Sequence, residues 1–206
     1  WFVLELASDN VDDHGGTYGD WSRFYEESFS WNPPVESNNE SLIRTWSSQY
    51  LAIANANQVL DALGKMEMTD KLRAAKGEAL ICRAYAHFVL VNIFCQQYDP
   101  NYPDDMGIPY MEKAETELDP KYERGTVAEV YAKIEKDIEE GLPLIDDAIY
   151  SVPKYHFNRK AAYSFAARFF LYYQKWDKAA EYASEALTNA PESQLRDYEA
   201  LLEYPM

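Results

Sequence analysis

Residues 69–97 read TDKLRAAKGEALICRAYAHFVLVNIFCQQ, and no other part of the chain carries so strong a fold signal. Apolar side chains recur in this stretch at steps of three and four residues, which is the period of an α-helix. They form two series on different faces: Leu72, Ala75, Ala79, Cys82, Ala86, Val89 and Ile93, and then Gly77, Ile81, Ala84, Phe88, Val91 and Cys95. A helix that is apolar on several faces has neighbours on several sides. We therefore expect this helix to be central to the core.

The segment before this stretch predicts a second helix. Ser37 and Glu40 fit a capping box that would start it, and Gly64 marks its end. Asn57 lies within its apolar stripe, and a buried amide must find hydrogen-bond partners. The other members of the stripe again follow helical steps: Ile43, Trp46, Tyr50, Ile53 and Leu60.

A long connection over residues 98–123, rich in Pro, Asp and Tyr, follows the central helix. Thr126 and Glu129 then form a further capping box, and Gly141 and Pro143 close the helix that begins there. No stretch of the sequence shows the alternation of a β-strand. The chain is therefore predicted to be all-α, with tetratricopeptide-like helix pairs and long loops.

The basis for the helix pairs is residues 158–191, which predict a helical hairpin. They resemble a tetratricopeptide repeat, a helix–turn–helix unit of about 34 residues. With Lys160 as the first position, the expected slots hold Tyr163, Ala167, Phe170, Ala179, Ala186 and Pro191. The pattern fails one unit earlier, so the chain holds one clear unit. Because such a unit cannot bury its apolar faces alone, we expect the earlier helices and downstream sequence to supply neighbours.

The net charge of the chain argues against two classes of binding partner. The 206 residues carry a formal net charge of −16, from 19 Lys and Arg against 35 Asp and Glu. A field this negative repels phosphate groups and anionic lipid headgroups, so we expect no nucleic-acid partner and no polybasic membrane contact. No apolar run approaches the roughly 18–20 residues that span a membrane. The length suits a single domain over residues 1–206.

Cysteine and histidine give no metal or redox motif. Cys82 and Cys95 lie on one predicted helix at a separation of roughly 20 Å, which is too far for a disulfide, so we expect two buried thiols. The three histidines, His14, His87 and His156, lack metal-ligand spacing. We expect His87 to be a hydrogen-bonded core residue, and we expect no metal and no cofactor.

Five groups of residues follow one another along the chain: Trp46, Tyr50, Ile53, Ala56, Asn57 and Leu60; Gly77-Glu78-Ala79 with Arg83-Ala84-Tyr85; Gly107-Ile108-Pro109; Arg124, Thr126, Val127, Glu129 and Tyr131; and Ala167-Arg168 with Trp176, Ala179 and Ala183. Together they resemble the SusD/RagB-like outer-membrane nutrient-binding lipoproteins of Bacteroidetes. The resemblance implies a protein anchored by lipid at the cell surface. It also implies that the protein captures a glycan or other nutrient and delivers it to a SusC-like TonB-dependent transporter.

The chain departs from that family in two ways. It lacks the lipobox cysteine expected at a mature N-terminus, and it is well under half of a typical family length. We therefore expect residues 1–206 to be the N-terminal part of a longer protein whose lipid anchor lies upstream.

Residues 8–39 are the candidate ligand-binding region. Three glycines and the Pro33-Pro34 pair discourage regular helix there, and loops held by a rigid scaffold often carry binding residues. Sugar rings need flat apolar faces for stacking and fixed polar groups for their hydroxyls. The candidate ligand-binding residues are Tyr18, Asp20, Trp21, Trp31 and Asn32. By contrast, Trp46 and Trp176 follow packing patterns, and we expect both to serve the core.

The leading hypothesis is thus binding without turnover, with no catalytic residue. A first alternative is a tetratricopeptide-type adaptor for a protein partner, although the low Lys and Arg count argues against a basic peptide groove. A second alternative is an acidic glycoside hydrolase. Such an enzyme needs two carboxyl groups about 5–10 Å apart across a cleft, and adjacency in an acidic sequence does not specify them.

Overall fold

The computed structural model describes residues 5–11, 23–32, 41–118 and 120–188. Every regular element in these residues is helical, which confirms the all-α prediction. The α-helices are α2 (Arg23–Phe29), α3 (Leu42–Leu63), α4 (Asp70–Phe94), α5 (Val127–Gly141), α6 (Arg159–Tyr172) and α7 (Trp176–Leu187). Three short 3-10 helices connect α5 to α6, namely η1 (Leu142–Leu144), η2 (Asp147–Ile149) and η3 (Pro153–Tyr155).

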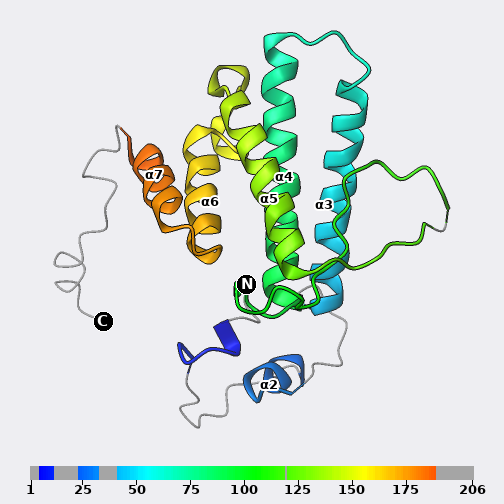
Figure 1. Cartoon of the computed structure of the whole chain (residues 1–206), viewed down its shortest axis with the longest axis vertical. Coiled ribbons are helices and arrows are strands. Elements are labelled where there is room, and N and C mark those ends of the chain that lie inside the picture. The colour runs from blue at the N-terminus through cyan, green and yellow to red at the C-terminus, as the bar shows by residue number, and fades with distance from the viewer. Residues whose placement is uncertain (1–4, 12–22, 33–40, 119, 189–206) are drawn as a thin grey trace.

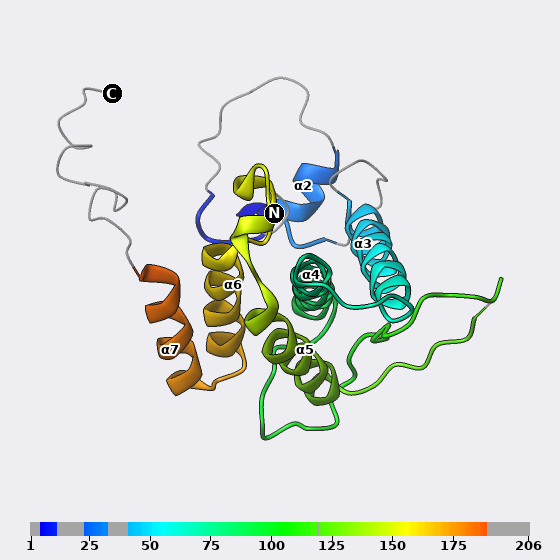
Figure 2. The ribbon, with the colours of Figure 1, turned by 90° about the horizontal axis from the view of Figure 1, so that it is seen from above.

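Helix α4 lies at the centre of the molecule, as expected. Seen from above, α3, α4, α6 and α7 follow one another in a row, and α5 packs across α4 from one side (Figures 1 and 2). The connection between α4 and α5 passes along α3, where it forms a broad excursion (Figure 1). This placement brings residues of the connection against one flank of α3.

The length and composition of α4 would also suit a membrane-crossing helix, although the sequence has no uninterrupted apolar run of that length. Most of α4 is buried inside the protein, and Arg83 in its middle pairs with Asp137 of α5. The neighbouring helices therefore account for its apolar surface. An aromatic cluster on the α5 and α6 side, mostly in edge-to-face contact, completes this packing: Phe88, Tyr131, Phe165, Phe169 and Tyr173.

Glycines set the close approach of α4 and α5. A Cβ atom on Gly77 would lie 2.8 Å from the carbonyl oxygen of Gly141 and 2.8 Å from Cβ of Leu144. Real Cβ atoms do not come so close to backbone, so only glycine allows this crossing. The Gly77 of the family-like motif therefore has a packing role.

The helix ends agree with the sequence in most places. Gly64 follows the last residue of α3, and the predicted capping box of Thr126 and Glu129 is formed at the start of α5. The predicted start of α3, near Ser37, was wrong, because the helix begins at Leu42. Ser37 and Glu40 lie outside the described residues, and the cap is Ser41, whose hydroxyl accepts from the N–H of Arg44 at 3.3 Å.

Residues 8–39 are not loop throughout, because α2 occupies Arg23–Phe29. The glycines and prolines that argued against helix flank this segment and do not interrupt it. Phe24 is buried, and Arg23 pairs with Glu27 one turn later at 2.6 Å. Local pairing and an apolar anchor therefore contribute to this helix of seven residues.

The helices α6 and α7 pack against each other within the predicted hairpin of residues 158–191. Asn158 caps α6, and the turn before α7 contains Gln174 in the left-handed region with a φ of 60°. Residues 189–191 lie outside the described part of the chain. The tetratricopeptide interpretation stays a prediction. Both cysteines are free, as expected, but each is only partly buried.

Candidate ligand-binding site

The five predicted ligand-binding residues fall into two groups. Tyr18, Asp20 and Trp21 lie outside the described residues, so their part in a site stays a prediction. Trp31 and Asn32 are described, and both are exposed at the C-terminal end of α2.

Trp31 ends α2 in an unusual backbone conformation. Its φ is 57°, in the left-handed region that a bulky residue rarely adopts and that costs about 1–2 kcal/mol. The N–H of Asn32 donates to the carbonyl of Glu27 at 2.8 Å, and the N–H of Trp31 donates to Ser28 at 3.3 Å. These two bonds form a Schellman cap, where glycine is the usual residue. Because the indole is 80% exposed, this cap holds a flat apolar face toward solvent.

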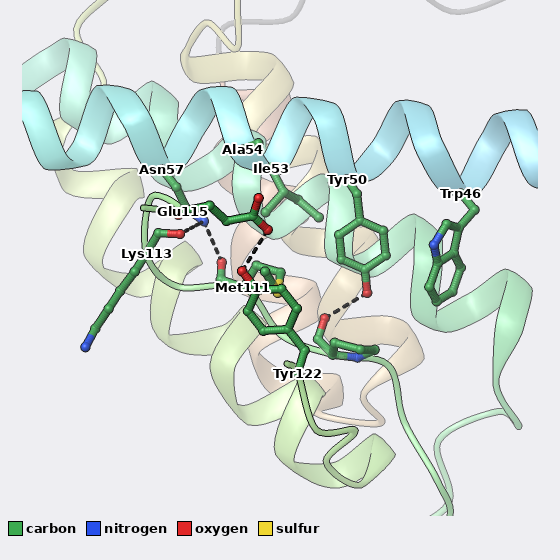
Figure 3. Close-up of a pocket in the computed structure, with 10 residues that line it drawn as sticks. Trp46, Tyr50, Ile53, Ala54, Asn57, Met111, Lys113, Glu115 and Tyr122 are labelled. Atoms are coloured by element: carbon green, nitrogen blue, oxygen red, sulfur yellow. Dashed lines mark hydrogen bonds between the residues drawn. The ribbon is translucent and has the colours of Figure 1, made fainter. Parts of the chain in front are cut away.

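A cleft lies between α3 and the connection that follows α4 (Figure 3). Its volume is about 320 Å³, which is at the lower end of the range for small-molecule sites. α3 contributes Trp46, Tyr50, Ile53, Ala54 and Asn57, and the connection contributes Pro109, Met111, Lys113, Glu115 and Tyr122.

Aromatic packing fixes the α3 side of the cleft. The Trp46 ring lies 4.9 Å from the Phe94 ring in an edge-to-face arrangement and 4.9 Å from the Tyr50 ring. The side chain of Tyr50 crosses to the connection, where its hydroxyl donates to the carbonyl of Pro109 at 2.8 Å. Burial raises the pKa of Tyr50, so its hydroxyl stays protonated as this bond requires.

Asn57 holds the connection two and four residues beyond Pro109. Its Nδ2 donates to the carbonyls of Met111 at 2.9 Å and Lys113 at 3.2 Å. Its Oδ1 accepts from Arg83 at 2.9 Å. The sequence predicted that a buried Asn57 would need partners, and this is confirmed.

A buried ion pair supports Asn57 from below. Arg83 donates through Nε and Nη2 to the two carboxylate oxygens of Asp137, at 2.7 and 2.6 Å. Arg83 also donates to the carbonyl of Glu112 at 3.0 Å. Tyr110 donates to Asp137 at 2.6 Å, and burial together with the Asp137 charge raises the pKa of Tyr110 well above its ordinary value. The connection is thus bound to α3, α4 and α5 at once.

His87 completes this network as a neutral residue. Its Nε2 accepts from the N–H of Met111 at 3.0 Å, so Nδ1 carries the proton and donates to the carbonyl of Arg83 at 2.9 Å. The ring stacks on Tyr110 at 3.7 Å. Burial lowers the pKa of His87 to about 3. The prediction of a hydrogen-bonded core histidine is confirmed.

The described lining of the cleft is mostly apolar and aromatic, with few ionisable groups. Glu115 is the one carboxylate among its described lining residues, and the hydroxyl of Tyr122 donates to it at 2.7 Å. Among the described residues, no cluster of three or more His, Cys, Asp or Glu side chains could hold a metal ion. The arrangement supplies aromatic faces and hydrogen-bond acceptors on a fixed scaffold.

The SusD-like family described as "Starch-binding associating with outer membrane" matches residues 5–171 of the chain. The chain belongs to this SusD-like family. No curated protein sequence matches it significantly.

Solved structures agree with the assignment to the SusD-like family. A SusD-like carbohydrate-binding protein from Bacteroides vulgatus is 28% identical, with a TM-score of 0.61 over 74% of this chain and 33% of its own. A SusD superfamily protein from Bacteroides thetaiotaomicron has a TM-score of 0.73 at 23% identity, over 91% of this chain and 40% of its own. A laminarin-binding SusD-like protein has a TM-score of 0.63 at 22% identity, over 80% of this chain and 33% of its own. The SusD-like chain thus spans well under half the length of these proteins.

Sequence reasoning missed two aromatic residues of this SusD-like protein. Trp46 was expected in the core, but it is 36% exposed and lines the cleft. Trp176 was also expected in the core, and it is 59% exposed at the start of α7. The helical spacing of Trp46 and Tyr50 was correct. The spacing did not reveal that these two side chains also face the connection after α4, because that placement depends on the path of a loop.

Proposed function

We propose that this SusD-like protein captures a glycan at the outer membrane and delivers it to a SusC-like TonB-dependent transporter, without hydrolysing the glycan. The family description supports starch-type ligands and outer-membrane association. The carbohydrate-binding relative and the laminarin-binding relative support a glycan as the nutrient. A lipid anchor upstream of residue 1 would hold the protein at the cell surface.

The observation that carries the proposal is Trp31. A hydrogen-bonded cap presents its indole to solvent, and the Asn32 amide follows directly in the chain. An exposed aromatic face stacks well on the C–H surface of a sugar, and an amide both donates to and accepts from hydroxyls. Backbone strain at an exposed aromatic residue is typical of functional sites. We propose that Tyr18, Asp20 and Trp21 add to this site.

The test is calorimetric titration of the full-length protein with maltoheptaose and laminarihexaose. Replacing Trp31→Ala removes one stacking face and should weaken binding about tenfold. The matched control is Trp176→Ala, an exposed tryptophan on the distant helix α7, which should bind as the unaltered protein does. Equal affinity of the Trp31→Ala variant would refute the site. Release of reducing ends during incubation with either glycan would refute binding without turnover.

A further inference from the structure

Trp31 is not among the described residues that line the cleft beside α3, so the cleft offers a binding surface in addition to the Trp31 indole. It has two open aromatic faces. Trp46 is held by Phe94 and Tyr50, and Tyr122 is 46% exposed with its hydroxyl fixed by Glu115. Figure 3 shows the rings of Trp46, Tyr50 and Tyr122 along the same side of α3. Ile53 and Met111 give the cleft an apolar floor.

The polar atoms of the cleft that remain available to a ligand are hydrogen-bond acceptors. Glu115 accepts from Tyr122 through Oε1, and its Oε2 has no hydrogen bond within the described residues. The hydroxyl oxygens of Tyr50 and Tyr122 have each used their proton and can still accept. Both amide protons of Asn57 are committed to backbone carbonyls, and the Lys113 ammonium points out of the cleft (Figure 3).

Hydrogen-bond acceptors beside aromatic faces favour a sugar as the ligand. Hydroxyl groups supply the donors, and the apolar face of a sugar ring supplies the surface for stacking. The Glu115 carboxylate and the net charge of −16 both repel anions, so uronates and sulfated sugars are disfavoured. Tyr50 and Asn57 tie the connection to α3 at Pro109, Met111 and Lys113, so this part of the cleft is fixed before ligand arrives, and preorganisation lowers the cost of binding.

We propose that this cleft is a second carbohydrate site, which takes neutral sugar units along the rings of Trp46, Tyr50 and Tyr122, with their hydroxyls donating to Glu115. The inference rests on the proposed function only for the class of ligand. A second site on the same chain lets one long glycan be held at two points, or two chains at once.

The test is 19F NMR of the full-length protein labelled with 5-fluorotryptophan. Residues 1–206 contain five tryptophans, and Trp→Phe variants at these positions assign their signals. The probes are maltoheptaose, laminarihexaose and cellohexaose as neutral glycans, and hexagalacturonate as an acidic one. We expect the Trp46 signal to shift and saturate with at least one neutral probe, to stay still with hexagalacturonate, and to shift equally in a Trp31→Ala background.

Two exposed substitutions test the assignment without disturbing the core. Tyr122→Ala should weaken the response of the Trp46 signal about tenfold, and Glu115→Gln should weaken it severalfold. Glu117→Gln, on an exposed neighbour outside the cleft lining, is the matched control and should change nothing.

The outcomes separate the two sites. If the Trp31 signal responds and the Trp46 signal does not, the second site is refuted while the proposed function holds. If only the Trp46 signal responds, the Trp31 site is refuted. If neither responds to any neutral probe, both are refuted.

Discussion

Asp137 is a buried carboxylate whose charge is balanced by Arg83 within the core. Three donated hydrogen bonds reach its two oxygens, two from Arg83 and one from Tyr110. Removing one member of such a pair leaves a charge in a medium that cannot solvate it, whereas replacing both members with apolar residues can be neutral.

Arg83→Met should therefore lower the free energy of unfolding by about 3–5 kcal/mol in chemical denaturation. The Arg83→Met/Asp137→Leu double variant should recover part of that loss. Arg73→Met is the matched control on the same helix, because Arg73 forms an exposed pair with Asp70, and its effect should stay within about 1 kcal/mol. An Arg83→Met loss as small as that of the control would contradict the buried-pair account.

His87 makes stability depend on pH. Its pKa falls from 6.5 to about 3 on burial, so between those values the unfolded chain binds a proton that the folded protein excludes. The free energy of unfolding should therefore decrease as the pH drops from 6.5 toward 3. His87→Phe should cost about 1–3 kcal/mol at pH 7, since the Met111 N–H loses its acceptor, yet give a shallower slope in that window. Thermal unfolding across the pH range checks this, and parallel slopes would exclude a role for His87.

At the scale of elements, the contact of α4 with α5 depends on Gly77 and Gly141, which have no room for a side chain. Gly64, at the end of α3, does have room for one. Gly77 and Gly141 lie against each other's backbone, whereas a Cβ on Gly64 would meet its nearest neighbours at an ordinary 3.5 Å. Gly64 also has a right-handed φ of −63° that alanine adopts freely.

Gly77→Ala and Gly64→Ala should consequently have effects of opposite sign. Overpacking at Gly77 should outweigh the helix propensity of alanine and destabilise the protein by about 1–3 kcal/mol. At Gly64, the loss of freedom in the unfolded chain should stabilise it by about 0.4–1 kcal/mol. Denaturation midpoints of the two variants give the comparison, and a stabilising Gly77→Ala would show that the helices can separate at little cost.

Local signals made most elements predictable. The stripes of α3 and α4, the Gly64 stop and the Thr126 capping box depend on residues within a few positions of each other. The short helix α2 was missed because the glycines and prolines that flank it predict loop, and its seven residues carry no strong helix signal of their own. The cleft was missed for a different reason. Its support joins Arg83 to Asp137 and Asn57 to Met111, each pair 54 positions apart, and no periodicity reports such a contact.

For the whole molecule, the dominant electrostatic fact is the net charge of −16. Local ion pairs compensate part of it, most densely between α5 and α7, where Lys175 and Lys178 meet Glu135 and Lys178 also meets Glu139. Glu135 is partly buried in these pairs, but both lysines are more than a third exposed, so solvent screens each pair and its contribution is small. Repulsion among the remaining carboxylates acts over the full surface.

Raising NaCl from 10 to 150 mM should therefore increase the melting temperature by a few degrees, because the screening length falls from about 30 to about 8 Å. Differential scanning calorimetry at constant pH provides the measurement. A decrease over the same range would mean that the ion pairs between α5 and α7 outweigh the general repulsion.

The hydrogen bonds of the connection after α4 also determine how fast its amide protons exchange with solvent. The Met111 N–H is bonded to a fully buried imidazole, and the Gly107 N–H donates to the Gly125 carbonyl at 2.8 Å, so both protons should exchange with deuterium as slowly as those of α4. Residues 114–118 have no backbone bond of this kind among those described and are mostly exposed, so they should exchange within seconds. A protease would then find a cleavable arc between two protected anchors, and a single cut there would leave the helices joined.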